Sequence, residues 1–259
     1  MYQIEGDNLP QTITPEVLFR KAILRLALKG HERLLHCGSA DALETAALAA
    51  CLSRGSVVGL SPGLTRDPGD LFLRNRYQNI TFIASDIEKM HFSGEFDTIF
   101  SQYALNWAVN PKKAYEALYT ALSPEGRILI WLDADGLSEE VVREISALLN
   151  DPAWSGYFRE YSFPYSLVTE DEAMELCEDA GFYLLSLERI ERLLTFPDES
   201  SFAAWVEKTW HPLVSRLDRS VSDQFVSALM GIYQTLYHQS GESGATIPVA
   251  GIEIEGRRN

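Results

Sequence analysis

The sequence has 259 residues, of which 46% are hydrophobic and 23% charged, and this balance is typical of a globular protein with a sizeable core. Its formal net charge is −15 at pH 7 and Lys and Arg form no basic stripe, so we predict no binding to nucleic acid. No apolar run reaches the roughly 20 residues that cross a membrane, and residues 1–8 lack the pattern of a secretory signal. We therefore expect a cytoplasmic protein that makes no membrane contact.

The cysteines and histidines predict neither a disulfide framework nor a metal site. The three cysteines, Cys37, Cys51 and Cys177, lie far apart among apolar neighbours, which favours buried thiols. No CxxC pair is present, and the five histidines never fall at the HExxH spacing.

The first half of the chain alternates helix and strand signals. Thr14 before Pro15 is an N-cap pattern, and Asp41 with Glu44 resembles a second helix start. We predict helices over 17–28, 42–52, 71–76 and 111–122, and strands over 33–37, 56–60, 79–84, 96–102 and 127–132. Strands that alternate with helices predict an α/β fold with a doubly wound, mostly parallel sheet.

The second half has longer elements and an aromatic irregular stretch over 151–165. Thr169 and Glu172 form a capping box for a helix that ends at Gly181. We predict further helices over 138–149, 200–210 and 221–237, and strands over 182–196 and 247–254, which makes the sheet seven-stranded. The two late helices and the N-terminal helix are expected to cover the carboxyl ends of the strands, where ligands bind in such sheets.

Three segments resemble the class I S-adenosylmethionine-dependent methyltransferases, and among these the small-molecule carboxyl methyltransferases that include trans-aconitate methyltransferase. Residues 96–107, FDTIFSQYALNW, are similar to the family's fourth strand and the loop after it. Residues 110–130 are similar to its next helix, Pro-Gly turn and fifth strand, with Glu125 where the family usually has glycine. Residues 202–214 resemble the lid helix of the subgroup.

The resemblance implies a Rossmann-like fold with a helical cap and S-adenosylmethionine as cofactor. It divides the chain into an N-terminal cap helix (1–30), a cofactor-binding core (31–135), and the C-terminal half of the sheet with helical lid insertions (136–259). Asp86 follows the third predicted strand, where the family places an acid that accepts from the adenine amino group. The alternative for Asp86 is an aspartate that caps a turn.

The family's cofactor motifs are altered at two places. The glycine loop, Glu/Asp-x-Gly-x-Gly-x-Gly, reads HCGSADA from His36, so only Gly38 remains of three glycines and a histidine replaces the acid. Ser61, or a deletion, stands where the family has an acid that binds both ribose hydroxyls. Because hydrogen bonds to a charged group are about twice as strong as neutral ones, we expect a loss of about 2–3 kcal/mol in cofactor binding.

The resemblance and these positions give two sets of candidate residues. The expected cofactor-binding residues are His36, Gly38, Ser61, Asp86, Ile87 and Gln102. The catalytic residues are not assigned, and the candidates are Tyr103, Asn106, Trp107 and His211, beside cap aromatics such as Trp205 and Trp210. Transfer to a carboxylate needs no base, which agrees with the lack of an obvious one.

Three functions remain open at this point. The first is S-adenosylmethionine-dependent methyl transfer to a small molecule, at a carboxylate or hydroxyl oxygen. The second is a catalytically silent relative that serves as a binding or regulatory protein, which the altered motifs favour. A dinucleotide-dependent dehydrogenase is disfavoured because the first turn lacks GxGxxG spacing. The assembly is left open between a monomer and a homodimer, with a partner protein that completes the site as a further option.

Overall fold

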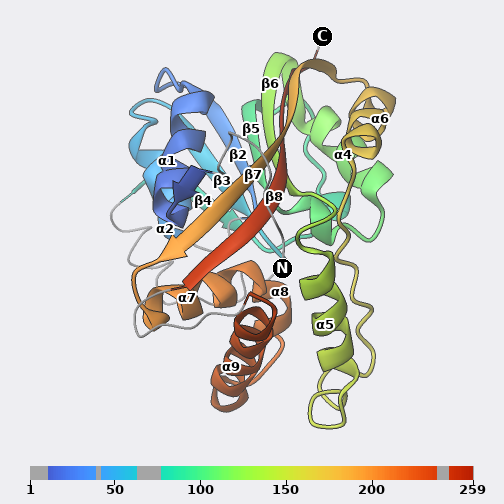
Figure 1. Cartoon of the computed structure of the whole chain (residues 1–259). Helices are drawn as coiled ribbons and strands as arrows, with labels where there is room; N and C mark the ends of the chain where they lie inside the picture. Colours follow the sequence, from blue (N-terminus) through green and yellow to red (C-terminus); the bar gives the residue numbers. More distant parts are fainter. Residues whose placement is uncertain (1–10, 39–41, 63–76, 238–244, 259) are drawn as a thin grey trace.

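The strands form a single twisted sheet that runs through the whole molecule (Figure 1). We describe it from a computed structural model, in which residues 11–38, 42–62, 77–237 and 245–258 are described. Among these residues the sheet has eight strands in the order β1-β7-β8-β6-β5-β2-β3-β4. They are β1 (Gln11–Ile13), β2 (Arg33–Cys37), β3 (Ser56–Leu60), β4 (Ile80–Ile83), β5 (Phe96–Gln102), β6 (Leu122–Asp133), β7 (Tyr183–Phe196) and β8 (Ala245–Arg257).

The mostly parallel, doubly wound sheet is confirmed, and the predicted number of strands is corrected from seven to eight. All neighbouring strands pair in parallel except β8, which is antiparallel to both β6 and β7. The additional strand is β1, which pairs with Arg192–Leu194 of β7. Three residues with two polar side chains carry no clear period-two pattern, so this edge strand could not be recognised in the sequence.

Helices cover both faces of the sheet (Figure 1). Helices α1 and α2 bury Leu18 and Leu48 against one face, and α4 and α6 bury Leu118 and Cys177 against the other. The helices are α1 (Pro15–Leu26), α2 (Ala42–Ala50), α4 (Pro111–Ala121), α5 (Glu139–Asn150), α6 (Glu170–Ala180), α7 (Glu199–Thr209), α8 (His211–Val214) and α9 (Arg219–Leu236), with 3-10 turns η1 (Ile87–Lys89) and η2 (Leu105–Trp107). No helix of the described residues is long and apolar enough to span a bilayer.

The caps that the sequence predicts are present where the structure describes them. Thr14 accepts the backbone N–H of Val17 at 3.4 Å, and both bonds of the Thr169–Glu172 capping box are formed. The helix start at Asp41 and the helix over 71–76 lie outside the described residues.

Helices α7 and α9, the two late helices predicted for the lid, gather with α5 and α8 at one end of the sheet, below the ends of the strands in Figure 1, and we call these four helices the lid. The indole of Trp210 donates to the Tyr233 hydroxyl at 2.9 Å, which joins the start of α8 to α9. Helix α1 is fixed to the sheet, because Arg25 donates to Glu253 and, at 2.7 Å, to Glu255 of β8, and its Pro15 and Leu18 line the cavity described below. Glu253 also receives Arg192 of β7 at 2.5 Å.

Strand β6 begins at Leu122, five residues before the predicted start, because Leu122 already pairs with Phe96. The pairing of β6 with β5 is irregular between Leu122 and Arg127, and Glu125 in this segment adopts a φ of 60°. This is the left-handed region that glycine adopts without strain and that other residues seldom enter. The backbone therefore explains why glycine is the usual residue at this turn.

We expect Glu125→Gly to stabilise the protein by about 1 kcal/mol. Relief of the left-handed strain, about 1–2 kcal/mol, exceeds the roughly 0.5–1 kcal/mol of entropy that glycine adds to the unfolded chain. Urea denaturation measures the change. The matched control is Glu116→Gly on the exposed surface of α4. This variant should have a free energy of unfolding about 1 kcal/mol lower than the wild type. A loss at both positions would contradict the strain argument.

Candidate functional site

A cavity opens at the carboxyl ends of the parallel strands, beneath the lid. It holds about 1230 Å³ of space free of protein atoms, with the solvent at its mouth included. Gly38, Ser61 and Asp86, which follow β2, β3 and β4, and Gln102 at the end of β5 line its sheet side, and Trp205 of α7 lines it from the lid. Ligands bind at this edge in open α/β sheets because the strand ends and their loops meet there.

Five of the six expected cofactor-binding residues lie at this cavity: Gly38, Ser61, Asp86, Ile87 and Gln102. Gly38 has a φ of +89°, and a Cβ at this position would lie 2.2 Å from the carbonyl oxygen of Gln102. The close approach of the two strands therefore demands glycine at 38 whether or not a ligand binds. The roles of the five residues toward a cofactor stay a prediction.

Asp86 presents a carboxylate at the cavity wall. It stands at the N-cap position of η1, but its side chain makes no capping hydrogen bond, which does not support the turn-capping alternative. Its partner is the ammonium group of Lys89 at 2.5 Å, and the Lys89 side chain is exposed. An exposed ion pair of this kind contributes little, so a ligand donor can replace Lys89 at low cost.

His36, the sixth expected cofactor-binding residue, is not among the described residues that line the cavity. Its side chain is fully buried, with Nδ1 2.9 Å from Thr45 Oγ1 and Nε2 3.3 Å from Gln102 Oε1. The ring stacks on Phe100 with centroids 5.3 Å apart. Burial lowers the pKa of His36 to about 3, while the bond to Gln102 acts the other way. His36 is thus a neutral support for Gln102.

The four catalytic candidates separate into two pairs. Tyr103 and Trp107 line the cavity, whereas Asn106 and His211 are not among the described lining residues. Tyr103 has a φ of 53°, and its N–H donates to the Trp131 carbonyl at 2.8 Å. Such strain in a non-glycine residue is typical of functional sites.

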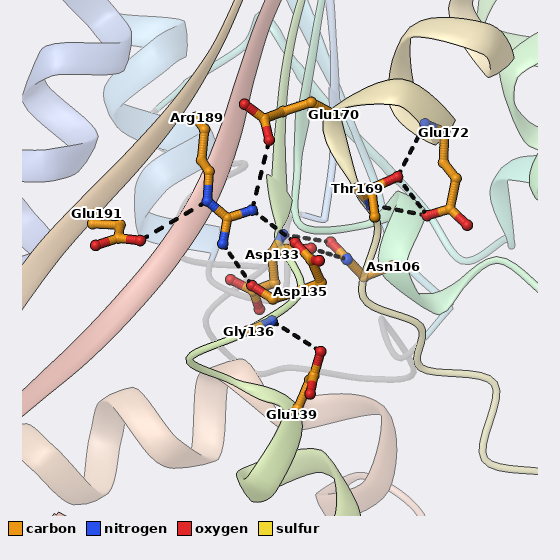
Figure 2. A network of polar contacts seen from close by, with 10 residues as sticks. All are labelled: Asn106, Asp133, Asp135, Gly136, Glu139, Thr169, Glu170, Glu172, Arg189 and Glu191. Atoms are coloured by element: carbon orange, nitrogen blue, oxygen red, sulfur yellow. Dashed lines mark hydrogen bonds and ion pairs between the residues drawn. The ribbon is translucent and has the colours of Figure 1, made fainter. Parts of the chain in front are cut away.

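The side chain of Asn106 binds backbone groups of two other segments. Its side chain is fully buried, and Nδ2 donates to the carbonyl oxygens of Asp133 at 2.9 Å and Ser166 at 2.7 Å. Oδ1 accepts the Asp133 N–H at 3.0 Å. Figure 2 shows this amide between the loop after β5 and the end of β6. One side chain therefore fixes the backbone N–H and carbonyl groups of Asp133 and the carbonyl group of Ser166, the residue after Tyr165.

Asp133 and Tyr165 also line the cavity, although neither was among the residues predicted for the site. Asp133 ends β6, and the Tyr165 hydroxyl donates to its Oδ2. Burial raises the pKa of the Asp133 carboxyl to about 6, against the lowering effect of the bond from Tyr165. The resemblance singled out Asp86 as an acid that follows a predicted strand, and Asp133 likewise follows the predicted strand over 127–132.

Asp135, two residues later, has a different environment (Figure 2). Arg189 of β7 donates to Asp135 Oδ1 at 2.7 Å and to its carbonyl oxygen at 2.8 Å. The same guanidinium lies 3.9 Å from Glu170 of α6. Asp135 is thus neutralised, whereas Asp133 forms no ion pair with any described residue.

An ion pair connects the core and the lid across the cavity. Lys208 of α7 lies 2.5 Å from Glu44 of α2, and both residues line the cavity. The sequence could not indicate this contact, because the two residues are far apart in the chain and each is ordinary on a helix surface.

Two of the three cysteines are poor candidates for a nucleophile. Cys37 and Cys177 are buried as predicted, and Cys51 is partly exposed. Burial raises the pKa of the Cys37 and Cys177 thiols, which disfavours the reactive thiolate.

Comparisons with known proteins identify the fold. A family model described as a methyltransferase domain matches residues 73–181. An uncharacterized methyltransferase of Schizosaccharomyces pombe is 26% identical over 182 residues, 68% of each chain. A putative methyltransferase from Bacillus halodurans has a similar structure, with a TM-score of 0.56, 19% identity, and coverage of 93% of this chain and 98% of that one.

A third relative was solved with ligands. It is phosphoethanolamine N-methyltransferase 2 of Haemonchus contortus in complex with phosphomonomethylethanolamine and S-adenosylhomocysteine. The TM-score is 0.56 at 15% identity, over 93% of this chain and 52% of that one. The chain therefore has the Rossmann-like fold of the class I methyltransferases.

The buried His36 predicts a pH dependence of stability. Between about pH 6.5 and 3 the unfolded chain binds a proton that the native state excludes, so the free energy of unfolding falls as the pH falls. This group contributes a slope of up to about 1.4 kcal/mol per pH unit. Urea denaturation from pH 7 to 4 should show a shallower slope for His36→Gln. His91→Gln, at an exposed site, is the control, and equal slopes in His36→Gln and the wild type would contradict the prediction.

We expect Asn106→Ala to destabilise the protein by at least about 3 kcal/mol, because three buried backbone groups lose their partner. Asn110→Ala serves as the control. It removes the cap that accepts the Lys113 N–H at 3.0 Å and should cost about 1 kcal/mol. Urea denaturation compares the two, and similar losses would show that the Asn106 amide is not a central clamp.

Proposed function

We propose that this chain is an S-adenosylmethionine-dependent methyltransferase that acts on a small molecule. The observation that carries the proposal is the cavity at the strand ends, where residues after four successive parallel strands come together. The family match and the methyltransferase relatives support it. The narrower resemblance to trans-aconitate methyltransferase stays a prediction.

The cavity residues fit the parts of the cofactor. Asp86 offers an acceptor for the adenine amino group, and Leu60, Ile87 and Ala108 offer apolar walls for the ring. Ser61 offers one hydroxyl for the ribose. When bound, the cofactor supplies a methyl group on a sulfonium that is already primed for displacement. The chain then has to hold the acceptor in line and exclude water, which is a task for the lid.

The altered residues also predict a reduced affinity for the cofactor. Ser61 replaces a carboxylate, and the neutral His36 offers no charge to the cofactor's ammonium group. The loss of about 2–3 kcal/mol corresponds to a factor of tens to a hundred in the dissociation constant. We therefore expect binding in the micromolar range.

Calorimetric titration with S-adenosylhomocysteine tests the proposal. Asp86→Ala should weaken binding at least about fivefold, because the adenine loses a charge-assisted hydrogen bond. Asp179→Ala on α6 removes the same charge away from the cavity and should leave the affinity unchanged.

Wild-type protein that binds neither S-adenosylhomocysteine nor S-adenosylmethionine at about 1 mM would overturn the proposal and favour a catalytically silent protein. Unchanged affinity in Asp86→Ala would show only that the adenine contact is wrongly assigned.

A further inference from the structure

The lid end of the cavity is an aromatic wall around one carboxylate. Tyr103, Trp107, Tyr165 and Trp205 line this end together with Asp133. Leu18, Leu194 and Val249 add apolar surface to the same cavity. Aromatic faces attract cations, and the attraction is stronger where water is excluded.

The aromatic wall is held in a fixed geometry. The rings of Trp107 and Tyr165 meet edge to face with centroids 4.8 Å apart, and Trp210 packs behind Tyr165 at 5.0 Å. Asn106 fixes the backbone of Asp133 and of Ser166, which follows Tyr165. The carboxylate and the rings are thus preorganised before any acceptor arrives.

One oxygen of the carboxylate is available to a ligand. Tyr165 occupies Oδ2 of Asp133, while Oδ1 accepts no hydrogen bond from any residue in the described part of the chain. A partly buried carboxylate without a cation is costly, and a ligand ammonium group would relieve that cost.

The charges at the cavity favour a cation over an anion. The charged side chains among the described lining residues are Glu44, Asp86, Glu88, Asp133 and Lys208. The single basic group in this set, Lys208, pairs with Glu44 at 2.5 Å. A carboxylate acceptor at the aromatic end would face Asp133 with no cation to balance it.

We propose that the methyl acceptor is an amine with an apolar body, whose ammonium group binds Asp133 Oδ1 within the aromatic wall. The inference rests on the proposed methyltransferase function and replaces the oxygen acceptor that the subgroup resemblance implies. Asp133 and the aromatic residues contact the acceptor, and Asn106 positions them.

Asp133 serves as the proton acceptor for the ammonium group in the methyl transfer. An ammonium group has no lone pair, so it must first give a proton to Asp133. The nitrogen then bonds to the methyl carbon as the carbon–sulfur bond breaks, and the sulfur keeps the electron pair as a neutral thioether. The product is a methylated ammonium, and Asp133 returns its proton to water. A carboxyl group with a pKa near 6 is closer to neutral pH than an ordinary aspartate and so suits this exchange.

Two probes with the same apolar body and opposite charge test the proposal. Phenethylamine and 3-phenylpropionate share a phenyl ring on a two-carbon chain, and each is titrated into wild-type protein with and without S-adenosylhomocysteine. Calorimetry and the fluorescence of Trp107 and Trp205 report binding without turnover. We expect phenethylamine to bind at least about tenfold more tightly than 3-phenylpropionate, because a charge pair in a partly desolvated site is worth more than about 1.4 kcal/mol.

The variants separate this proposal from the proposed function. Asp133→Asn should weaken phenethylamine binding at least about tenfold and change the affinity for S-adenosylhomocysteine less than twofold. The retained affinity for S-adenosylhomocysteine also shows that the variant is folded. Asp179→Asn, with the same charge change on α6, should alter neither affinity.

Several outcomes would overturn the amine acceptor. The first two are wild-type protein that binds 3-phenylpropionate as tightly as phenethylamine or more tightly, and wild-type protein that binds neither probe. The third is an affinity for phenethylamine that Asp133→Asn leaves unchanged. The fourth is an equal loss of affinity for S-adenosylhomocysteine in Asp133→Asn, which would assign Asp133 to the cofactor. Phenethylamine binding that depends on Asp133, in a protein that binds no S-adenosylhomocysteine, would support the amine site and overturn the methyltransferase proposal.

Discussion

The side-chain amide of Asn106 is the contact on which the cavity depends. It bonds to the backbone on both sides of Asp133 and to Ser166, which join the end of β6 to the segment that leads into α6. A buried amide that keeps its partners in a site of low dielectric is worth more than the same bonds in water. Together with the pairing of Asp133 with Gly251 of β8, this side chain fixes the place of the Asp133 carboxylate and of the segment that carries Tyr165.

The altered glycine loop and the intact cavity have one explanation in the packing of β2 and β5. Gly38 is required because a Cβ would collide with the Gln102 carbonyl, so its presence says nothing about a ligand. His36, in turn, fills the space beneath α2 and bonds to Gln102 instead of entering the cavity. The motif can therefore change in sequence while the space at the strand ends stays open.

Local signals in the sequence were sufficient for most of the fold. The alternation of apolar strands and capped helices predicted seven of the strands and the lid helices, because strand burial and helix capping depend on residues that are neighbours in the sequence. The contacts that define the site are not local. Tyr165 contacts Asp133 across 32 positions that include helix α5, and Lys208 of α7 contacts Glu44 of α2, which is still farther away in the sequence. A histidine at position 36 looks the same in sequence whether it faces a ligand or Thr45, so its burial needed the structure.

The place of β8 in the sheet has a consequence for how the molecule is assembled. It is the last strand in the sequence, yet it lies between β6 and β7 and pairs with both. A chain synthesised only as far as the lid helices has two bare strand edges, at β6 and at β7, and such edges invite pairing with other chains. Both edges therefore stay open until β8 pairs with them, and the sheet is complete only when this last described strand lies between β6 and β7.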